Sequence, residues 1–329
     1  MKKLALWTLL LFPVVTVALL GFALEGYTAE MSGTLTNIRF SFNKNAGQTP
    51  QYVADTRGFF KKYGLKVERI EFSNNPDMVA ALDRGHLEMM ASIPGSPLSA
   101  REQGYDLVAF MQNETSNFAA PDSGALIARR GSGIKSVADL KGKIVACLYL
   151  SSQDCIDSKY VIKKAGVDLK SITFIEANFG THFDLLRSGQ VDAVSTVNPF
   201  TTQILTKGAG DLLAWNYIES NPGQPLGAWW AKKQWVTKNP QVVRAFQRAI
   251  KDAIDFLRQD KVRAREVVAE YTGLDKGLLT EMAPLNWNYH VDPQAWQQEA
   301  KILVEMGALQ KMPKPEEYFA EQIKEYFKK

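Results

Sequence analysis

The sequence contains the same structural pattern twice. In each copy, a helix-like segment ends at a glycine, and a short apolar run that stops at a proline follows it. The two equivalent glycines, Gly85 and Gly189, are 104 positions apart (189 − 85). An earlier pair, Gly64 and Gly166, is 102 positions apart (166 − 64) and also separates a helix-like segment from a strand-like one. The matching stretches are residues 58–70 with 160–172 and residues 82–94 with 186–199.

This repeat restricts the fold to two similar α/β units. Glycine adopts the left-handed backbone conformation that ends a helix and allows a strand to begin, so each copy reads as helix, strand, helix, strand. Two copies are too few for a solenoid. We therefore predict two facing lobes with a cleft between them.

Composition is ordinary for a globular protein and excludes one class of partner. The chain has 329 residues, 46% hydrophobic and 22% charged, with a formal net charge of +4. This length is enough for two domains, each with its own core. Because Lys and Arg are scattered rather than clustered, the sequence does not support a nucleic-acid partner.

The N-terminus has the composition of an export signal. Lys2 and Lys3 precede residues 4–24, which carry no charge, and Glu25 begins a polar stretch. This order is typical of a signal peptide, although the apolar stretch is close to the ~20 residues that span a bilayer. We interpret residues 1–29 as a cleaved signal peptide or a retained N-terminal anchor, which makes the protein periplasmic and leaves a membrane tether open.

The chain has two cysteines, Cys147 and Cys155, and three histidines. An oxidising compartment permits a disulfide, but the spacing equally permits two buried thiols. These side chains do not have the spacing of a structural metal site. We predict no metal and no cofactor.

Two clusters of turn-forming residues divide the chain. Residues 113–123 are polar and contain Pro121, and residues 221–225 contain two prolines and a glycine. We predict that the chain leaves the first lobe in the former segment and returns in the latter, so that two crossings form a hinge. Lobe one would comprise residues 34–123 and 226–329, and lobe two residues 124–225. Within lobe one, residues 51–63 and 315–326 each read as one helix.

In α/β sheets, ligands bind beyond the carboxyl ends of the strands. This rule selects five loops, at residues 42–49, 94–96, 149–153, 177–182 and 197–201, which are rich in small and amide side chains. Hydroxyl groups and free N–H groups at a helix start favour an anion, and an apolar cleft with a few polar groups suits a small molecule. Capping of helices and core packing are the alternative roles of these residues. The predicted polar contacts are Asn43, Gln48, Ser96, Ser151, Ser152, His182 and Asn198, with Phe42 and Phe179 as apolar walls.

No catalytic arrangement is visible in the sequence. Asp154, Asp157 and Asp184 flank the selected loops, but no nucleophile, base and acid have a supporting spacing. We therefore predict a binding protein rather than an enzyme.

Several motifs together resemble the nitrate/sulfonate/taurine group of periplasmic solute-binding proteins. They are YVADTRGFFKKYGLKVE at residues 52–68, ALDRGHLE at 81–88, IKSVADLKGKIV at 134–145, LRSGQVDA at 186–193 and WVTKNPQVVRAF at 235–246. The resemblance spans about residues 37–260. It implies an α/β fold of two lobes, each a mixed sheet flanked by helices, that closes on a small solute and delivers it to the permease of an ABC importer.

The resemblance does not fix the ligand. Amides, one lysine and the nearby aromatics favour an organic anion, such as a carboxylate, a sulfonate or an aromatic acid, over nitrate. We expect a monomer. Two alternatives remain open: a pyrimidine-synthase-like enzyme on the same fold, whose Cys-rich catalytic motif this sequence lacks, and a membrane-tethered ligand sensor.

Overall fold

The computed structural model describes residues 35–42, 45–72 and 75–328. The expected leader and Asn43 lie outside these residues. Among the helices in the described ranges, none has the length and apolar character needed to cross a membrane.

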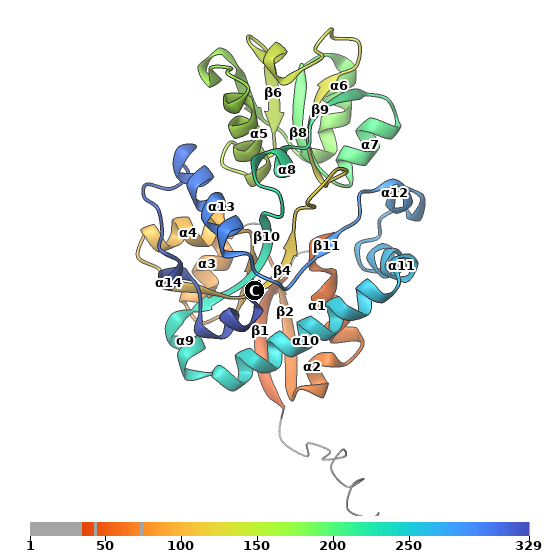
Figure 1. Cartoon of the computed structure of the whole chain (residues 1–329). Coiled ribbons are helices and arrows are strands. Elements are labelled where there is room, and N and C mark those ends of the chain that lie inside the picture. The colour runs from red at the N-terminus through yellow and green to blue at the C-terminus, as the bar shows by residue number, and fades with distance from the viewer. Residues whose placement is uncertain (1–34, 43–44, 73–74, 329) are drawn as a thin grey trace, which may run out of the picture. The chain divides into compact units, whose positions relative to one another are not determined.

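Two β-sheets and a pair of strands organise the described chain (Figure 1). The first sheet has four strands in the order β11-β4-β10-β3, and a parallel pair, β1 and β2, lies beside it. A parallel bridge between Phe40 and Met89 joins the pair to the sheet. These strands are β1 (Thr36–Phe42), β2 (Leu65–Glu71), β3 (Met90–Ser92), β4 (Leu107–Thr115), β10 (Pro225–Lys232) and β11 (Asn286–Trp287).

The second sheet has five strands in the order β7-β6-β8-β5-β9. It is mixed, because β6 pairs in parallel with β7 and β8 whereas β5 pairs antiparallel with β8 and β9. For description, residues 124–224 around this sheet are called lobe two, and the other described residues lobe one. The strands are β5 (Gly124–Arg129), β6 (Ile144–Cys147), β7 (Thr173–Glu176), β8 (Ala193–Val197) and β9 (Gly210–Ala214).

Helices flank both sheets, which confirms the predicted fold class. In lobe one they are α1 (Thr49–Thr56), α2 (Phe59–Lys62), α3 (Asn75–Asp83), α4 (Gly95–Glu102), α9 (Lys233–Lys238), α10 (Pro240–Gln259), α11 (Lys261–Thr272), α12 (Lys276–Glu281), α13 (Pro293–Glu305) and α14 (Pro315–Tyr318). In lobe two they are α5 (Gln153–Lys164), α6 (His182–Ser188), α7 (Phe200–Thr206) and α8 (Asn216–Ser220).

The repeated glycines adopt the expected conformation. Gly85 and Gly189 both have a φ of 74°, and Gly64 and Gly166 have φ values of 77° and 82°. Each ends a helical segment and precedes a strand, so the repeat is a repeat of backbone geometry. The prediction of two related α/β units is confirmed at this level.

Each lobe has its own hydrophobic interior. One large cluster fills lobe one, where the long helix α10 buries Val243, Phe246 and Ile250 against the strands. Two smaller clusters cover the two faces of the five-stranded sheet. In the described chain, Ile156 of α5 is the buried lobe-two side chain that joins the lobe-one cluster. The interiors are therefore separate except at α5.

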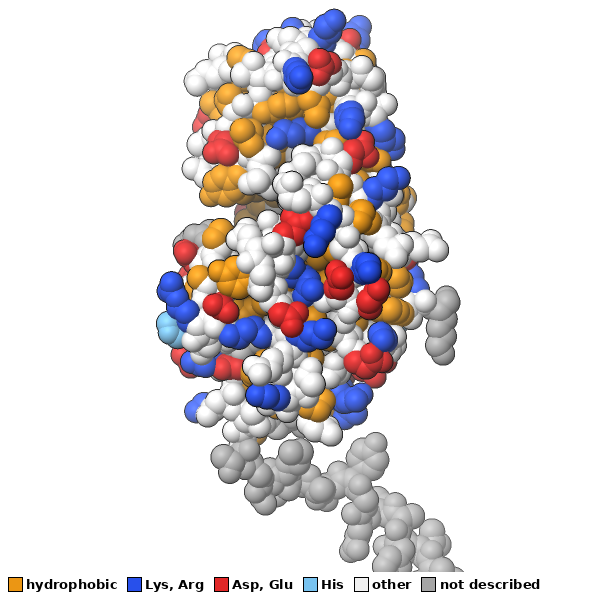
Figure 2. All heavy atoms as spheres, turned by 90° about the vertical axis from the view of Figure 1, so that its left-hand side faces the viewer, with side chains coloured by type: hydrophobic (Ala, Val, Ile, Leu, Met, Phe, Trp, Pro, Cys, Tyr) orange, Lys and Arg blue, Asp and Glu red, His pale blue; other side chains and the backbone are white. Residues whose placement is uncertain are grey.

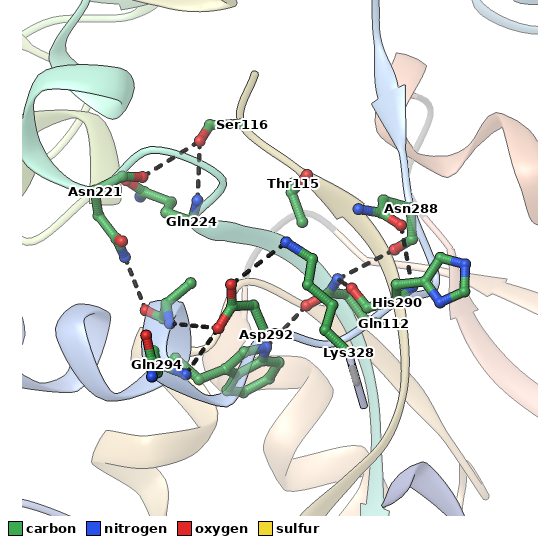
Figure 3. A network of polar contacts seen from close by, with 12 residues as sticks. Gln112, Thr115, Ser116, Asn221, Gln224, Asn288, His290, Asp292, Gln294 and Lys328 are labelled. Atoms are coloured by element: carbon green, nitrogen blue, oxygen red, sulfur yellow. Dashed lines mark hydrogen bonds and ion pairs between the residues drawn. The ribbon is translucent and has the colours of Figure 1, made fainter. Parts of the chain in front are cut away.

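Two chain segments cross between the lobes side by side (Figure 3). The backbone N–H of Ser116 donates to the carbonyl of Gln224 (2.9 Å), and the N–H of Gln224 donates to the Ser116 hydroxyl (3.0 Å). Asn221 extends this contact to α13, because its side-chain amide donates to the carbonyl of Ala295 (2.8 Å). The crossings at the predicted breaker clusters are thus paired with each other and attached to lobe one.

Two predicted helices are interrupted. The segment 51–63 contains α1 and α2, which are separated at Gly58 in the left-handed conformation (φ 74°). Residues 315–326 form the short helix α14 and a separate 3₁₀ turn at Glu321–Tyr326. The sequence pattern of each segment predicted helical structure. It did not predict the change in chain direction between the two parts.

The paired glycines lead to a prediction about stability. A Cβ at Gly85 would lie in open space, and one at Gly189 would lie 4.0 Å from Arg129 Nε, an ordinary contact distance, so the positive φ itself accounts for the penalty in Gly85→Ala and Gly189→Ala. We expect each variant to lose about 1–2 kcal/mol of unfolding free energy, measured by urea denaturation. Gly180→Ala is the control, because Gly180 has ordinary φ and no atom closer than 3.9 Å to the added methyl. Unequal losses at the two repeated glycines would contradict their equivalence.

Candidate functional site

The predicted site residues of lobe two gather at the carboxyl ends of β7 and β8. The ring of Phe179 stacks on Phe200 (5.9 Å between centroids) and meets His182 edge-on (5.5 Å). His182 is fully buried, and burial lowers its pKa to about 4. Its Nε2 lies 3.1 Å from the carbonyl of Ala177, so the neutral ring donates there and presents Nδ1 as an acceptor. Among the described residues, Nδ1 has no hydrogen-bond partner.

Asn198 follows β8 directly. Its side-chain oxygen accepts hydrogen bonds from the N–H (3.2 Å) and hydroxyl (2.7 Å) of Thr202, which fixes the orientation of the amide. The amide nitrogen is buried and has no hydrogen-bond partner in the part of the chain that the structure describes. Asn198 therefore caps the start of α7 and keeps a donor for another group.

The predicted residues of lobe one are more dispersed. Phe42 packs against Tyr271 (5.9 Å) and lies under the guanidinium of Arg69 (5.4 Å). Gln48 is buried and accepts a hydrogen bond from the amide of Gln51 (2.7 Å). Ser96 accepts one from the amide of Asn75 (2.9 Å). These contacts are structural, and ligand contact at all three positions stays a prediction.

Side chains of the same turn already bind the polar groups at the start of α5. The Ser152 hydroxyl donates to the carbonyl of Tyr149 (2.6 Å), and Ser151 is exposed in the same turn. Burial raises the pKa of Asp154 to about 6, although this carboxylate also accepts hydrogen bonds from the Ser195 hydroxyl (3.3 Å) and from the backbone of the first turn of α5. A disulfide joins Cys147 at the end of β6 to Cys155 in α5, with a Cα–Cα distance of 5.5 Å. Asp154 thus fills the place where the sequence predicted an anion.

A pair of buried carboxyl groups joins the lobes beside this turn. The amide of Gln153 donates both to Asp157 on α5 (2.9 Å) and to Glu299 on α13 (2.7 Å), and Gln224 donates to Asp157 (2.9 Å). Burial raises the pKa of Asp157 to about 7, and burial together with Asp157 raises that of Glu299. Because two carboxylates this close repel each other, the pair holds at least one proton near neutral pH.

The strand β4, which leads into the first crossing segment, carries Asn113 and Glu114, whose side chains lie against the predicted loop at residues 42–49. Its register with β10 is irregular, because Gly227 pairs with Glu114 whereas Ala228 pairs with Gln112, which leaves Asn113 as an extra residue. The Asn113 amide donates to the carbonyl of Gly47 (3.3 Å), and a Cβ on Gly47 would collide with the carboxylate of Glu114. Two neighbouring side chains of β4 therefore reach the same glycine.

Acidic side chains from both lobes surround Tyr217 of α8. Burial raises the pKa of Tyr217, and the charges of Asp154, Asp157, Asp122 and Glu114 raise it further. None of these four carboxylates takes part in an ion pair within the part of the chain that the structure describes. The region between the lobes is consequently acidic, whereas the opposite charges on the outer face in Figure 2 are interspersed.

Sequence reasoning missed most of this acidic region. Glu114, Tyr217 and Glu299 were not among the predicted residues, and Asp157 was noted only as flanking a loop. One signal was present for Glu114, because its charge comes shortly after the apolar run of β4, beyond Gln112 and Asn113, inside the predicted crossing segment. Over the described residues, no group of three or more His, Cys, Asp or Glu is placed to hold a metal ion.

Comparison with known families identifies the chain. The model of the family described as "NMT1/THI5 like" matches residues 45–264, two thirds of the sequence. The chain belongs to the NMT1/THI5-like family. A Brucella abortus protein named as a binding protein is 28% identical over 234 residues, 69% of this chain and 68% of the relative. A Schizosaccharomyces pombe protein, named 4-amino-5-hydroxymethyl-2-methylpyrimidine phosphate synthase, is 32% identical over 96 residues, 29% of this chain and 26% of that protein.

Solved structures agree with the fold. The periplasmic aliphatic sulphonate binding protein of Escherichia coli has a TM-score of 0.71 at 20% sequence identity, over 90% of this chain and 97% of that one. At this identity the likeness concerns the fold, which is that of periplasmic solute-binding proteins. The relatives of the chain thus include a protein named as a binding protein and a protein named as a synthase.

The carboxyl pair between the lobes leads to a prediction about pH. Asp157 and Glu299 keep protons in the folded protein at pH values where the unfolded chain has lost them, so stability falls as pH rises from about 4 to about 7. Glu299→Gln replaces the protonated carboxyl by a neutral amide. We expect this variant to remove part of the fall, about 1–3 kcal/mol, in denaturation curves measured across that range.

The matched control is Glu305→Gln, which changes the exposed end of the same helix, α13, and its ion pair with Lys163. It should leave the pH slope unchanged. A Glu299→Gln variant with the slope of the unmodified protein would show that the pair ionises freely in the folded state.

Proposed function

We propose that this protein is the solute-binding component of an ABC importer, located in the periplasm. The observation that carries the proposal is the combination of two lobes with largely separate hydrophobic interiors, two hydrogen-bonded crossing segments, and buried polar atoms such as the Asn198 amide nitrogen that have no partner in the described chain. Such a molecule binds by closing, because only a solute that contacts both lobes stabilises the closed form. Its partners are the solute and a permease.

The division into residues 34–123 with 226–329 and residues 124–225 is retained as the proposed lobe boundary. The hydrogen bonds between Ser116 and Gln224 support it, because they lie where the two segments leave lobe one. Few backbone dihedrals then need to change for the lobes to move.

We propose a small organic acid as the solute. The proposal rests on the resemblance to sulfonate and nitrate receptors and on the donors available in lobe two, chiefly the Asn198 amide nitrogen and the hydroxyl of Ser151. It predicts that the acid group lies toward the loops of lobe two, because the carboxylates nearer the hinge repel an anion.

An enzyme on the same fold is the alternative. The relatives named as synthases support it, whereas a relative that is 28% identical over 69% of this chain is named as a binding protein. Among the described side chains, the Ser195 hydroxyl lies 3.3 Å from the Asp154 carboxylate, but it is fully buried and also donates to the Asp154 carbonyl (2.8 Å). We therefore propose binding without chemical change.

Isothermal titration of the mature chain with alkyl sulfonates, alkyl carboxylates, aromatic acids and nitrate tests this function. We expect saturable one-to-one binding of at least one organic acid, with a decrease in the radius of gyration in X-ray scattering on closure. Binding of neutral or cationic compounds alone would contradict the proposed acid. Conversion of the added compound, detected by mass spectrometry, would favour the enzyme.

The serines that precede α5 provide a second test. If they donate directly to the acid, Ser151→Ala with Ser152→Ala should weaken binding by roughly 1–3 kcal/mol. Ser96→Ala is a useful comparison, because its hydroxyl already accepts from Asn75 in lobe one. Unchanged affinity of the double variant would leave Ser151 and Ser152 as turn residues only.

A further inference from the structure

Helix α5 belongs to lobe two in the chain, but it lies against α13 of lobe one (Figure 1). Residues three and four positions apart share a face of a helix, and one face of α5 carries Gln153, Ile156, Asp157 and Tyr160. Ile156 and Tyr160 pack on the hydrophobic interior of lobe one. The disulfide of Cys155 joins the same helix to β6 of lobe two. Helix α5 therefore connects the two lobes.

The centre of the contact between α5 and α13 is polar. Asp157 and Glu299 are both fully buried, and the amide nitrogen of Gln153 donates to one oxygen of each (2.9 and 2.7 Å). The other oxygens, Asp157 Oδ1 and Glu299 Oε2, have no hydrogen-bond partner in the described chain. Neither carboxyl group forms an ion pair among the described residues. Two negative charges are therefore poorly compensated at this contact.

The surrounding charges do not offset the pair. Asp154 acts on Asp157 and raises its pKa further, whereas the ammonium group of Lys159 interacts with Asp154 and Glu176. On the facing helix α8, Tyr217 stays neutral, because burial raises its pKa well above the ordinary value. The other charged side chains of the elements packed against α5 and α13 have their own partners or are exposed; they are Lys163 with Glu305, Arg129 with Asp192, Arg101 with Asp106, Lys232 with Asp83, the hydrogen-bonded Glu102, Asp139, Lys164 and Glu219, and the exposed Lys170 and Lys301.

The same contact sets the position of two loops that the sequence predicted for a ligand. A Cβ on Gly95, at the start of α4, would lie 3.6 Å from Gln153 Oε1 and 3.5 Å from Leu303 of α13. The turn before α5 and the loop at residues 94–96 therefore meet where α5 rests on α13. Separation of the two helices would move these loops apart.

We propose that Gln153, Asp157 and Glu299 form a proton-dependent latch between the lobes, which holds α5 on α13 at acidic pH and weakens as the two carboxyl groups lose protons. It rests on the proposed function, because the latch sets the distance between loops that would hold the solute. The latch thereby makes closure of the lobes depend on pH.

The direction of this dependence follows from the two forms of the contact. In the latched form, burial raises the pKa of Asp157 to about 7 and raises that of Glu299 as well. After release, water solvates both carboxyl groups, which then ionise in their ordinary range near pH 4. Release therefore sets protons free, and rising pH favours it. Between about pH 4 and about pH 7, each proton set free increases the ratio of released to latched chains by up to about tenfold per pH unit.

Spin labels measure this motion in the ligand-free chain. Lys170→Cys in lobe two and Lys301→Cys on α13 replace two exposed residues, and labels there report the distance between the lobes. Double electron–electron resonance should give one distance at about pH 4.5 and a second population at about pH 8.5, with a ratio of the two that changes by roughly tenfold or more. Near-UV circular dichroism checks that the chain is folded at both pH values. A distance distribution that does not change with pH would overturn the latch.

Three variants separate the latch from a general effect of pH. Glu299→Gln provides a neutral amide that can donate to Asp157, so it should keep the acidic-pH distance at both pH values. Gln153→Ala removes the bridge and should increase the released population at both. Glu305→Gln, the matched control on α13, removes the exposed ion pair with Lys163 and should retain the pH response. A Glu299→Gln chain that responds to pH like the unmodified chain would also contradict the latch.

The latch and the proposed function can fail separately. No solute is present in the spin-label measurement, so its result does not depend on binding. A distance that ignores pH overturns the latch and leaves the proposed function, which the titrations with organic acids test. A distance that responds as expected, in a chain that binds no organic acid, supports the latch and contradicts the proposed function.

Discussion

The pairing of two chain segments between the lobes is the constraint on which the structure depends. Ser116 and Gln224 exchange hydrogen bonds where the chain leaves and re-enters lobe one, and Asn221 attaches the second segment to α13. Each lobe fills its own interior except at α5, and these segments are the covalent connection between the two lobes. The opening and closing that we propose would then require little change in either core.

Burying the polar groups at this junction costs folding free energy. Asp157 and Glu299 share a buried site, and burial together with Asp122 raises the pKa of Glu114 to about 7. Replacing buried carboxyl groups by apolar residues is often neutral or stabilising, so stability alone does not explain the carboxyl pair. The pair connects the lobes through α5 and α13, whereas Glu114 lies against Gly47 in the loop before α1.

The sequence predicted the architecture well because glycine geometry and apolar periodicity are local properties. Gly85 and Gly189 reveal the repeat, and the breaker residues around Gln224 mark the crossing. The acidic site was not predictable in the same way. Asn113 becomes an extra residue only when β4 pairs with β10, and Glu299 meets Asp157 only when α13 packs on α5. Contacts between residues far apart in the sequence decide both arrangements.

Native mass spectrometry of the protein purified from its own host, without denaturation, tests the central claim most directly. The account predicts a complex of one chain with one small organic molecule, which leaves on mild activation with its mass unchanged and can be added back. A chain that never carries a small molecule, or one that converts the bound compound during incubation, would contradict a receptor that holds its solute unaltered between two halves.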